Sequence, residues 1–251
     1  MPSEANDERI WWDAAAVDIQ SAKGKIAADE SAWSGELLER CLEQIIPTLD
    51  AHCDRAKPAC VLDLGCGIGR LTIPISQRRL NWTLHGVDIS WNMIELAYKL
   101  DAHIQWSTCN GRTLPYDEAA FDAVYSMITL QHLPREAQRG YIHEVARVLL
   151  PGGVFRFQVL EGTAESFMWN ELDEAYLHAS CAATGLKITA LNRVAPLSGG
   201  DAKVLWVTAV KRDATPPAAE ELTPAEVPSK KPKAATKKDV KKTTTKRGRK
   251  S

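Results

Sequence analysis

The chain has 251 residues, of which 45% are hydrophobic and 25% are charged, and this composition is typical of a globular protein with a sizeable core. It contains no run of about 18 apolar residues, so we expect no membrane-spanning helix. Residues 1–9 are polar and acidic and lack the basic and apolar regions of a signal peptide. We therefore expect a cytoplasmic protein.

The formal net charge of −1 hides a strong asymmetry along the chain. Between Pro228 and Ser251 there are eleven Lys and Arg residues and a single acidic residue, Asp239, so the rest of the chain is acidic. Blocks of like charge are often interaction tails, and the two parts need separate functional interpretations.

Residues 1–57 are predicted to form a helical N-terminal cap. Apolar residues recur near helical spacing from Trp11 to Ile19 and again from Leu37 to Ile46. Pro47 is expected to end or kink the second of these helices.

Residues 58–212 alternate strand and helix patterns, which predicts an α/β domain with a parallel sheet between layers of helices. The predicted strands are Cys60–Leu64, Thr83–Ile89, Ile104–Ser107, Phe121–Met127, Val154–Leu160, Leu186–Asn192 and Lys203–Lys211, the last two pairing as a hairpin. The predicted helices are Arg70–Arg79, Ser90–Leu100 with Ser90 as its N-cap, Arg135–Leu150 and Ala164–Thr184.

Residues 213–251 are rich in Pro, Ala, Thr, Glu and Lys. Such a segment buries too little apolar surface to offset its chain entropy, so we expect a disordered tail.

The most informative motif runs from Val61 to Arg70, with the sequence Val-Leu-Asp-Leu-Gly-Cys-Gly-Ile-Gly-Arg. A buried strand leads into a glycine-rich turn that opens a helix, and glycines let a ligand approach the backbone closely. The G-x-G-x-G spacing differs from the G-x-G-x-x-G of dinucleotide-binding folds, which disfavours a dehydrogenase. Asp63 instead suits a ligand with an ammonium group, such as the methionine end of S-adenosylmethionine.

Four further motifs occur in order along the chain. Asp88 ends the second predicted strand, where a carboxylate can accept hydrogen bonds from both hydroxyls of a ribose. Asn110 comes after the third strand, and its amide can reach an adenine edge. The remaining two motifs are Phe121–Met127 with Leu130–Leu133, and Arg147–Gly153.

In this order and spacing, the five motifs resemble the class I S-adenosylmethionine-dependent methyltransferase family. The resemblance is strong over residues 58–160 and weaker to about residue 212. It implies a Rossmann-like three-layer sandwich with a seven-stranded, mostly parallel sheet in the order 3-2-1-4-5-7-6, in which strand 7 is antiparallel. It also implies S-adenosylmethionine as the cofactor.

The resemblance assigns roles by position. Asp63 and the glycines occupy the positions that bind the methionine end of the cofactor. Asp88 occupies the position that binds the ribose, and Ile89 the position that contacts the adenine. Ser126 and Met127 occupy the end of the fourth strand, which lies beneath the sulfonium. The residues predicted to bind the cofactor are Asp63, Gly65, Cys66, Gly67, Gly69, Asp88, Ile89, Met93, Asn110, Gly111, Ser126 and Met127.

Other residues admit two interpretations each. His132 could act as a general base, or it could shape the pocket wall. Trp11, Trp12 and Trp33 could line an acceptor pocket, or anchor the N-terminal helices through their large apolar area. The six cysteines show no metal-ligand spacing and are expected to be free thiols, mostly buried, and we expect no metal site.

Two classes of methyl acceptor fit the sequence. The first, which we favour, is a small molecule with an O, N or C nucleophile, and the second is a macromolecule. The tail 228–251 could contact nucleic acid non-specifically, and Arg247-Gly248-Arg249 resembles the core of an AT-hook without its following proline. The motif of amino-group DNA methyltransferases, Asn-Pro-Pro-Tyr, is absent after the fourth strand. A third hypothesis is a protein that binds S-adenosylmethionine without turnover.

Overall fold

The computed structural model describes residues 4–27, 29–54, 56–162, 170–195 and 203–212. The chain divides into two units, Met1–Ala214 and Thr215–Ser251. The second unit, with the predicted disordered tail, lies outside the described residues. No helix within the described ranges is both long and apolar enough to cross a membrane.

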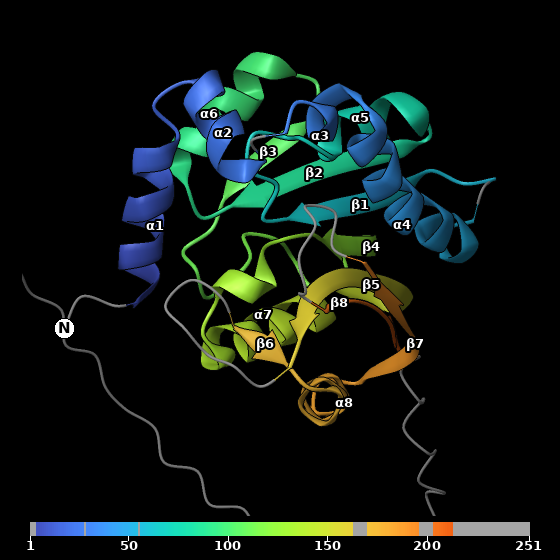
Figure 1. Ribbon diagram of the computed structural model, residues 1–251. Coiled ribbons are helices and arrows are strands. Elements are labelled where there is room, and N and C mark those ends of the chain that lie inside the picture. Colours follow the sequence, from blue (N-terminus) through green and yellow to red (C-terminus); the bar gives the residue numbers. More distant parts are fainter. Residues whose placement is uncertain (1–3, 28, 55, 163–169, 196–202, 213–251) are drawn as a thin grey trace, which may run out of the picture. The chain divides into compact units, whose positions relative to one another are not determined.

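One mixed sheet forms the centre of the first unit (Figure 1). Its strands are β1 (Ala59–Leu64), β2 (Trp82–Asp88), β3 (Gln105–Thr108), β4 (Phe121–Ser126), β5 (Leu149–Glu161), β6 (Glu171–Leu172), β7 (Leu186–Val194) and β8 (Val204–Lys211). The order is β3-β2-β1-β4-β5-β8-β7, and the short β6 pairs with β5. All pairings are parallel except those of β8, which runs antiparallel to β5 and β7.

Helices cover both faces of the sheet, as the apolar character of its central strands requires. The helices are α1 (Glu4–Ala15), α2 (Ile19–Ile26), α3 (Ser31–Ser34), α4 (Glu36–His52), α5 (Thr72–Arg78), α6 (Trp91–Leu100), the 3₁₀ helix η1 (Leu130–His132), α7 (Arg135–Val148) and α8 (Glu174–Ala182). Side chains of α4 and α5 join one hydrophobic core with Val61 and Trp206 of the sheet. Those of α7 and α8 join a second core, on the other face, with Leu62 and Phe155.

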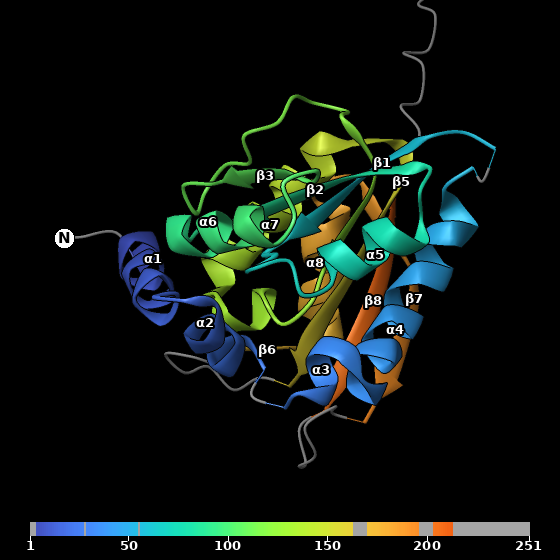
Figure 2. The same cartoon turned by 90° about the horizontal axis from the view of Figure 1, so that it is seen from above.

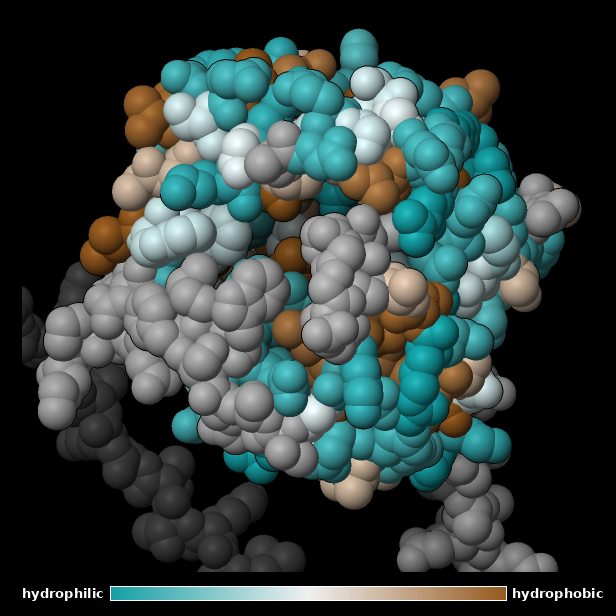
Figure 3. Space-filling model, viewed as in Figure 1, coloured by the Kyte–Doolittle hydropathy of each residue, from teal (hydrophilic) through white to brown (hydrophobic). Residues whose placement is uncertain are grey.

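The first two helices pack beside α6 at one side of the domain, and the two views agree on this placement (Figures 1 and 2). Ala15, Ala22, Ile68 and Met93 form a third, smaller core between them. On the face shown in Figure 3, hydrophobic surface gathers in the hollowed middle and hydrophilic side chains surround it.

The predicted α/β architecture and strand order are confirmed, because β7 and β8 are the sixth and seventh predicted strands and β8 is antiparallel. The sheet has one strand more than predicted, since the two-residue β6 adds to β5. Ser90 caps α6 as expected, its hydroxyl accepting from the N–H of Met93.

Three of the boundaries that differ from the predictions have a clear physical cause. Pro47 lies inside α4 and does not end it, because the buried face of that helix continues through Leu49 and packing outweighs the proline penalty of about 3 kcal/mol. Helix α7 ends at Val148 because β5 begins at Leu149 and takes in the Pro-Gly-Gly segment. The described part of the last predicted helix begins only at Glu174, since Asp173 caps it there.

Candidate functional site

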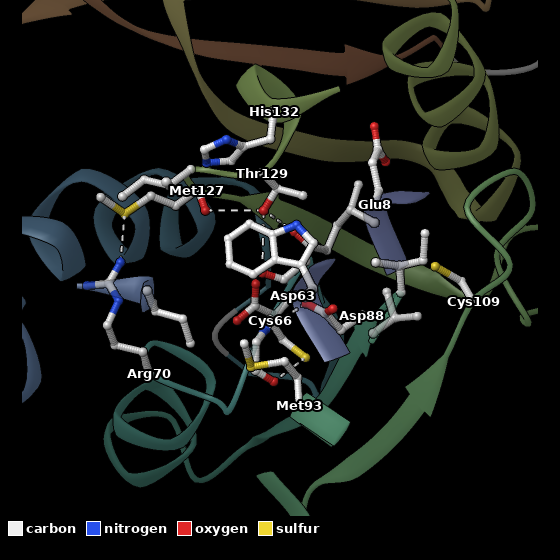
Figure 4. A pocket seen from close by; sticks show the side chains of 18 of the residues that line it. Glu8, Asp63, Cys66, Arg70, Asp88, Met93, Cys109, Met127, Thr129 and His132 are labelled. Atoms are coloured by element: carbon white, nitrogen blue, oxygen red, sulfur yellow. Dashed lines mark hydrogen bonds between the residues drawn. The ribbon is translucent and has the colours of Figure 1, made fainter. Parts of the chain in front are cut away.

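The carboxyl ends of β1, β2 and β4 surround a cavity of about 240 Å³ (Figure 4). Strand order reverses between β1 and β4, and open α/β sheets bind ligands at such a point. Helices α1 and α2 supply the other side of the cavity through Glu8, Trp11, Trp12, Lys25 and Ile26.

The glycine-rich turn forms the floor next to β1. Gly65 and Gly67 have φ angles of +76° and +54°, a region that favours glycine. A Cβ at Gly65 would overlap the side chain of Thr129, so only glycine fits against this segment. Gly67 lies close to Ile26 of α2, where a Cβ would come within 2.9 Å of the Ile26 Cδ1 atom.

Asp63 lies at the base of the cavity and is 3% exposed. Its Oδ2 accepts hydrogen bonds from the Thr72 hydroxyl at 2.6 Å and the Tyr125 hydroxyl at 2.9 Å. Burial raises the pKa of Asp63 to about 7, although these hydroxyls and nearby Arg70 act to lower it. No described residue donates to Oδ1, which leaves that oxygen for a ligand with an ammonium group.

Asp88 lies at the end of β2, on the adjacent side of the turn. Its Oδ2 accepts from the N–H of Gly67 and its Oδ1 from the N–H of Ser90, both at 2.9 Å. Burial raises the pKa of this carboxyl as well. Each oxygen of a carboxylate can accept a second hydrogen bond, so the group is suited to a pair of hydroxyls.

Most of the predicted cofactor residues come together in this cavity. Its lining contains Asp63, Gly65, Cys66, Gly67, Asp88, Ile89, Met93, Met127 and His132. Their roles as ligand contacts stay predictions.

Four predicted residues lie outside the lining. The Cβ position of Gly69 faces Trp106, and the buried Ser126 hydroxyl donates to the Leu64 carbonyl at 2.9 Å. Asn110 accepts from the N–H groups of Arg112 and Thr113, which folds its loop, and Gly111 belongs to that loop. The structure therefore gives these residues local packing or turn-forming contacts.

The aromatic residues of the cap and His132 meet at the cavity. The Trp12 and His132 rings pack edge to face, with centroids 5.7 Å apart, and Figure 4 shows His132 above Thr129. Trp11 also lines the cavity, whereas the indole of Trp33 donates to the Ala27 carbonyl. Whether His132 takes a proton stays a prediction.

Several lining residues were missed by the sequence analysis. Arg70 directly follows the last glycine of the motif, so its place in the sequence could have indicated that it lines the cavity. Cys109 and Tyr141, whose Sγ and Oη atoms are 3.3 Å apart, close the end of the cavity near Asp88. Nothing in the local sequence marks Tyr141, because only the packing of α7 brings it there.

A second cavity, of about 930 Å³, adjoins the first. The two share four lining residues, Ile26, Arg70, Met127 and Ile128. Ile128 has a φ of +59°, a strained conformation for a β-branched residue, and such strain concentrates at functional sites. The shared wall therefore includes the segment directly after β4.

All six cysteines are free thiols, and four of them are buried, as predicted. Among the described residues, no group of three or more His, Cys, Asp or Glu side chains could hold a metal ion.

Comparison with known proteins fits this geometry. Residues 61–153, from β1 into β5, match the family model described as a methyltransferase domain. Over these residues the chain is thus similar to methyltransferase domains. The matched segment contains the glycine turn, the cavity residues Asp63 and Asp88, and Ile128.

Two curated relatives have a similar methyltransferase domain. The methyltransferase GfsG of Streptomyces halstedii is 31% identical over 121 residues, which are 46% of this chain and 41% of the relative. The 27-O-demethylrifamycin SV methyltransferase of Amycolatopsis mediterranei is 32% identical over 132 residues, 50% of this chain and 46% of that protein. The chain thus spans about half the length of the curated relatives it matches.

The fold of the methyltransferase domain also occurs in solved structures. Magnesium protoporphyrin IX methyltransferase from Synechocystis PCC 6803, solved with bound S-adenosylmethionine, matches with a TM-score of 0.62 at 16% identity, covering 84% of this chain and 98% of that one. This similarity establishes the fold.

Proposed function

We propose that the protein is an S-adenosylmethionine-dependent methyltransferase that transfers the methyl group to an O, N or C nucleophile of a small molecule. The observation that carries the proposal is the pairing of Asp63 and Asp88 on either side of a glycine turn that closes on a cavity. The methyltransferase family match over the same residues supports it.

The residues of the first cavity fit this cofactor. The turn that lines the cavity needs glycine at Gly65, where a Cβ would overlap Thr129, and the unused Oδ1 of Asp63 suits the ammonium group of the methionine end. Asp88 suits the ribose hydroxyls, and Ile89, Met93 and Leu133 offer apolar contact to the adenine. When bound, S-adenosylmethionine supplies an electrophilic methyl group.

The rest of the site aligns the reactants and excludes water, which is the main requirement of a direct displacement. Trp11 and Trp12 cover the first cavity, and the second cavity offers space for an acceptor beyond Met127 and Ile128. The size and largely apolar lining of the second cavity, and the small-molecule acceptor named for the Amycolatopsis relative, support a small acceptor.

Calorimetric titration tests the cofactor. We expect S-adenosylmethionine and S-adenosylhomocysteine to bind the wild type with micromolar dissociation constants, and NAD not to bind. Asp88→Ala should weaken both adenosyl ligands by roughly 2 kcal/mol, the value of lost hydrogen bonds to a charged group.

Tighter binding of NAD, or no binding of either adenosyl ligand, would contradict the proposal. The alternative of a binding protein without turnover is tested by incubating the protein with S-adenosylmethionine and cell extract. Accumulation of S-adenosylhomocysteine excludes that alternative.

We assign residues 1–57 to an N-terminal cap, 58–212 to the methyltransferase domain and 213–251 to a basic tail, and we place the protein in the cytoplasm. Cell fractionation tests the location. Non-specific contact of the tail 228–251 with nucleic acid is the alternative that would favour a macromolecular acceptor.

A further inference from the structure

The second cavity has mainly apolar walls. They include Leu37 of α4, Leu160 of β5, Val194 at the end of β7, and Val204 with Trp206 of β8. Its volume of about 930 Å³ is in the range of sites for small organic molecules. Among its polar lining residues, Arg70 and Gln158 are buried, and each has one side-chain atom without a partner among the described residues.

The first is the guanidinium of Arg70, whose residue is 8% exposed. Its Nη1 donates to the Ala32 carbonyl at 3.4 Å and lies 3.6 Å from the Cys41 sulfur, and its Nη2 lies 3.7 Å from the Met127 sulfur. Its Nε has no partner among the described residues. These contacts are long and involve no carboxylate, although a buried arginine is always charged.

A buried charge without a counter-ion is costly, and proteins normally pair it. Asp63 is near enough for Arg70 to lower its pKa, but its Oδ2 is held by Thr72 and Tyr125, and it forms no ion pair with Arg70. Arg70 is therefore poised to bind an anion that the described protein does not supply.

The second unsatisfied group is the side-chain carbonyl of Gln158 on β5. Gln158 is 6% exposed, and its amide nitrogen donates to Gln131 Oε1 at 3.3 Å. Its Oε1 is buried without a partner among the described residues. An N–H or O–H group of a ligand would satisfy it.

We infer that the second cavity binds the methyl acceptor, and that this acceptor is a mainly apolar small carboxylic acid with a separate N–H or O–H donor. Arg70 holds the carboxylate and Gln158 Oε1 accepts from the donor. The inference rests on the proposed function. Ala32 and Cys41, which approach the guanidinium, line the second cavity and not the first, so the anion belongs to the acceptor side.

Indole-3-butanoate is a suitable probe, because it combines a carboxylate, an apolar body and one N–H donor. We would measure its binding to the full chain by calorimetry with S-adenosylhomocysteine at saturation, alongside its primary amide and its N-methyl derivative. The wild type should bind the acid at least tenfold more tightly than the amide. Arg70→Gln should abolish that preference, and Gln158→Leu should abolish the preference for the N–H form.

Arg40→Gln is the matched control, because Arg40 lines the same cavity but is exposed, and it should retain the preference for the acid. Arg70→Gln removes an unpaired buried charge and should leave the melting temperature no lower than that of the wild type. If it does unfold, Arg70→Lys tests the same point, since it keeps the charge and should keep a preference for the acid.

Equal binding of acid and amide to the wild type would overturn the inference. So would an Arg70→Gln variant that loses S-adenosylhomocysteine but keeps the acid preference, because Arg70 would then serve the cofactor's carboxylate. Failure of the wild type to bind S-adenosylhomocysteine would instead contradict the proposed function. In that case the affinities for the acid and the amide, measured without S-adenosylhomocysteine, would still test whether Arg70 binds the carboxylate.

Discussion

Asp63 has to change its protonation state if it is to face a positively charged ligand. Burial raises the pKa of the free carboxyl to about 7, so near neutral pH it is partly protonated. The folded protein thus holds a proton that the unfolded chain releases near 3.8. Stability is therefore unaffected by this group below that pH and falls as pH rises from 3.8 towards 7.

The same carboxyl makes cofactor binding depend on pH. An ammonium group beside Asp63 favours the ionised form, so binding below pH 7 should release a proton. We expect the affinity for S-adenosylhomocysteine to rise about tenfold per unit between pH 5.5 and 6.5 and to level off above 7. Calorimetry in buffers of different ionisation enthalpy measures both the affinity and the released proton.

Asp63→Asn is the control for this pH dependence. It has no proton to lose, so its weaker binding should not change across the same range. A wild type whose affinity is constant from pH 5.5 to 7 would show that ligand binding is not linked to the ionisation of Asp63.

Residues beside a local motif could be predicted from sequence, and residues brought in by packing could not. Asp63 and Asp88 end two strands whose order places them together, and both line the cavity. Glu8 and Tyr141 line it because α1 and α7 pack there, and neither carries a local signal. Asn110 was predicted from its position after the third strand to reach the adenine, but its side-chain oxygen accepts hydrogen bonds within its own loop.

At the scale of elements, hydrogen bonds to Asp13 add to the hydrophobic contacts that hold α1 against α6. Asp13 Oδ1 accepts from the Ser90 hydroxyl at 2.7 Å and from the Asn92 N–H at 3.2 Å. The Asn92 amide also donates to the Asp13 carbonyl at 2.9 Å. Because α1 carries Trp11 and Trp12, this contact positions the two indole side chains that line the first cavity.

Asp13→Ala should therefore loosen the cover without disturbing the base of the cavity. We expect S-adenosylhomocysteine to dissociate about tenfold faster, equivalent to roughly 1.4 kcal/mol. Stopped-flow tryptophan fluorescence measures this rate, since Trp11 and Trp12 line the cavity.

Asp18→Ala is the matched control, because Asp18 caps α2 through the Ser21 N–H and does not bond to α6. It should lower the melting temperature slightly, because a helix cap is lost, and leave the dissociation rate near that of the wild type. Equal acceleration in the two variants would mean that the link to α6 has no special role.

Helix boundaries were less predictable than helix positions, for physical reasons. Helix α2 begins after its Asp18 cap and helix α8 begins after its Asp173 cap, and neither boundary was predicted. Pro47 misled the prediction, because the intrinsic cost of a proline does not include the sheet face on which α4 packs.

For the whole molecule, the decisive feature is the position of β8 between β5 and β7. It contributes buried residues from Val204 to Ala209, among them Trp206, and it ends at Lys211. The sheet therefore needs the chain as far as Lys211, and we expect it to form without residues 213–251.

Deletion of residues 213–251 should leave the melting temperature and S-adenosylhomocysteine binding unchanged. Any binding of a DNA fragment should fall in this variant and lose its dependence on salt, because the basic residues of the tail are gone. Deletion of residues 203–251 should yield no folded protein by circular dichroism. A short form that loses cofactor binding would show that the tail takes part in the site.

The place of β8 also means that the sheet can be completed only after the chain has been synthesised as far as Lys211. Chains fold from the N-terminus during synthesis, at roughly 5–20 residues per second. The glycine turn and both aspartates emerge early, but β5 has an open edge until the last strand is made. During that interval the nascent chain exposes a long apolar strand edge, a template for pairing with other chains, so chaperone capture should be strongest between synthesis of β5 and of β8.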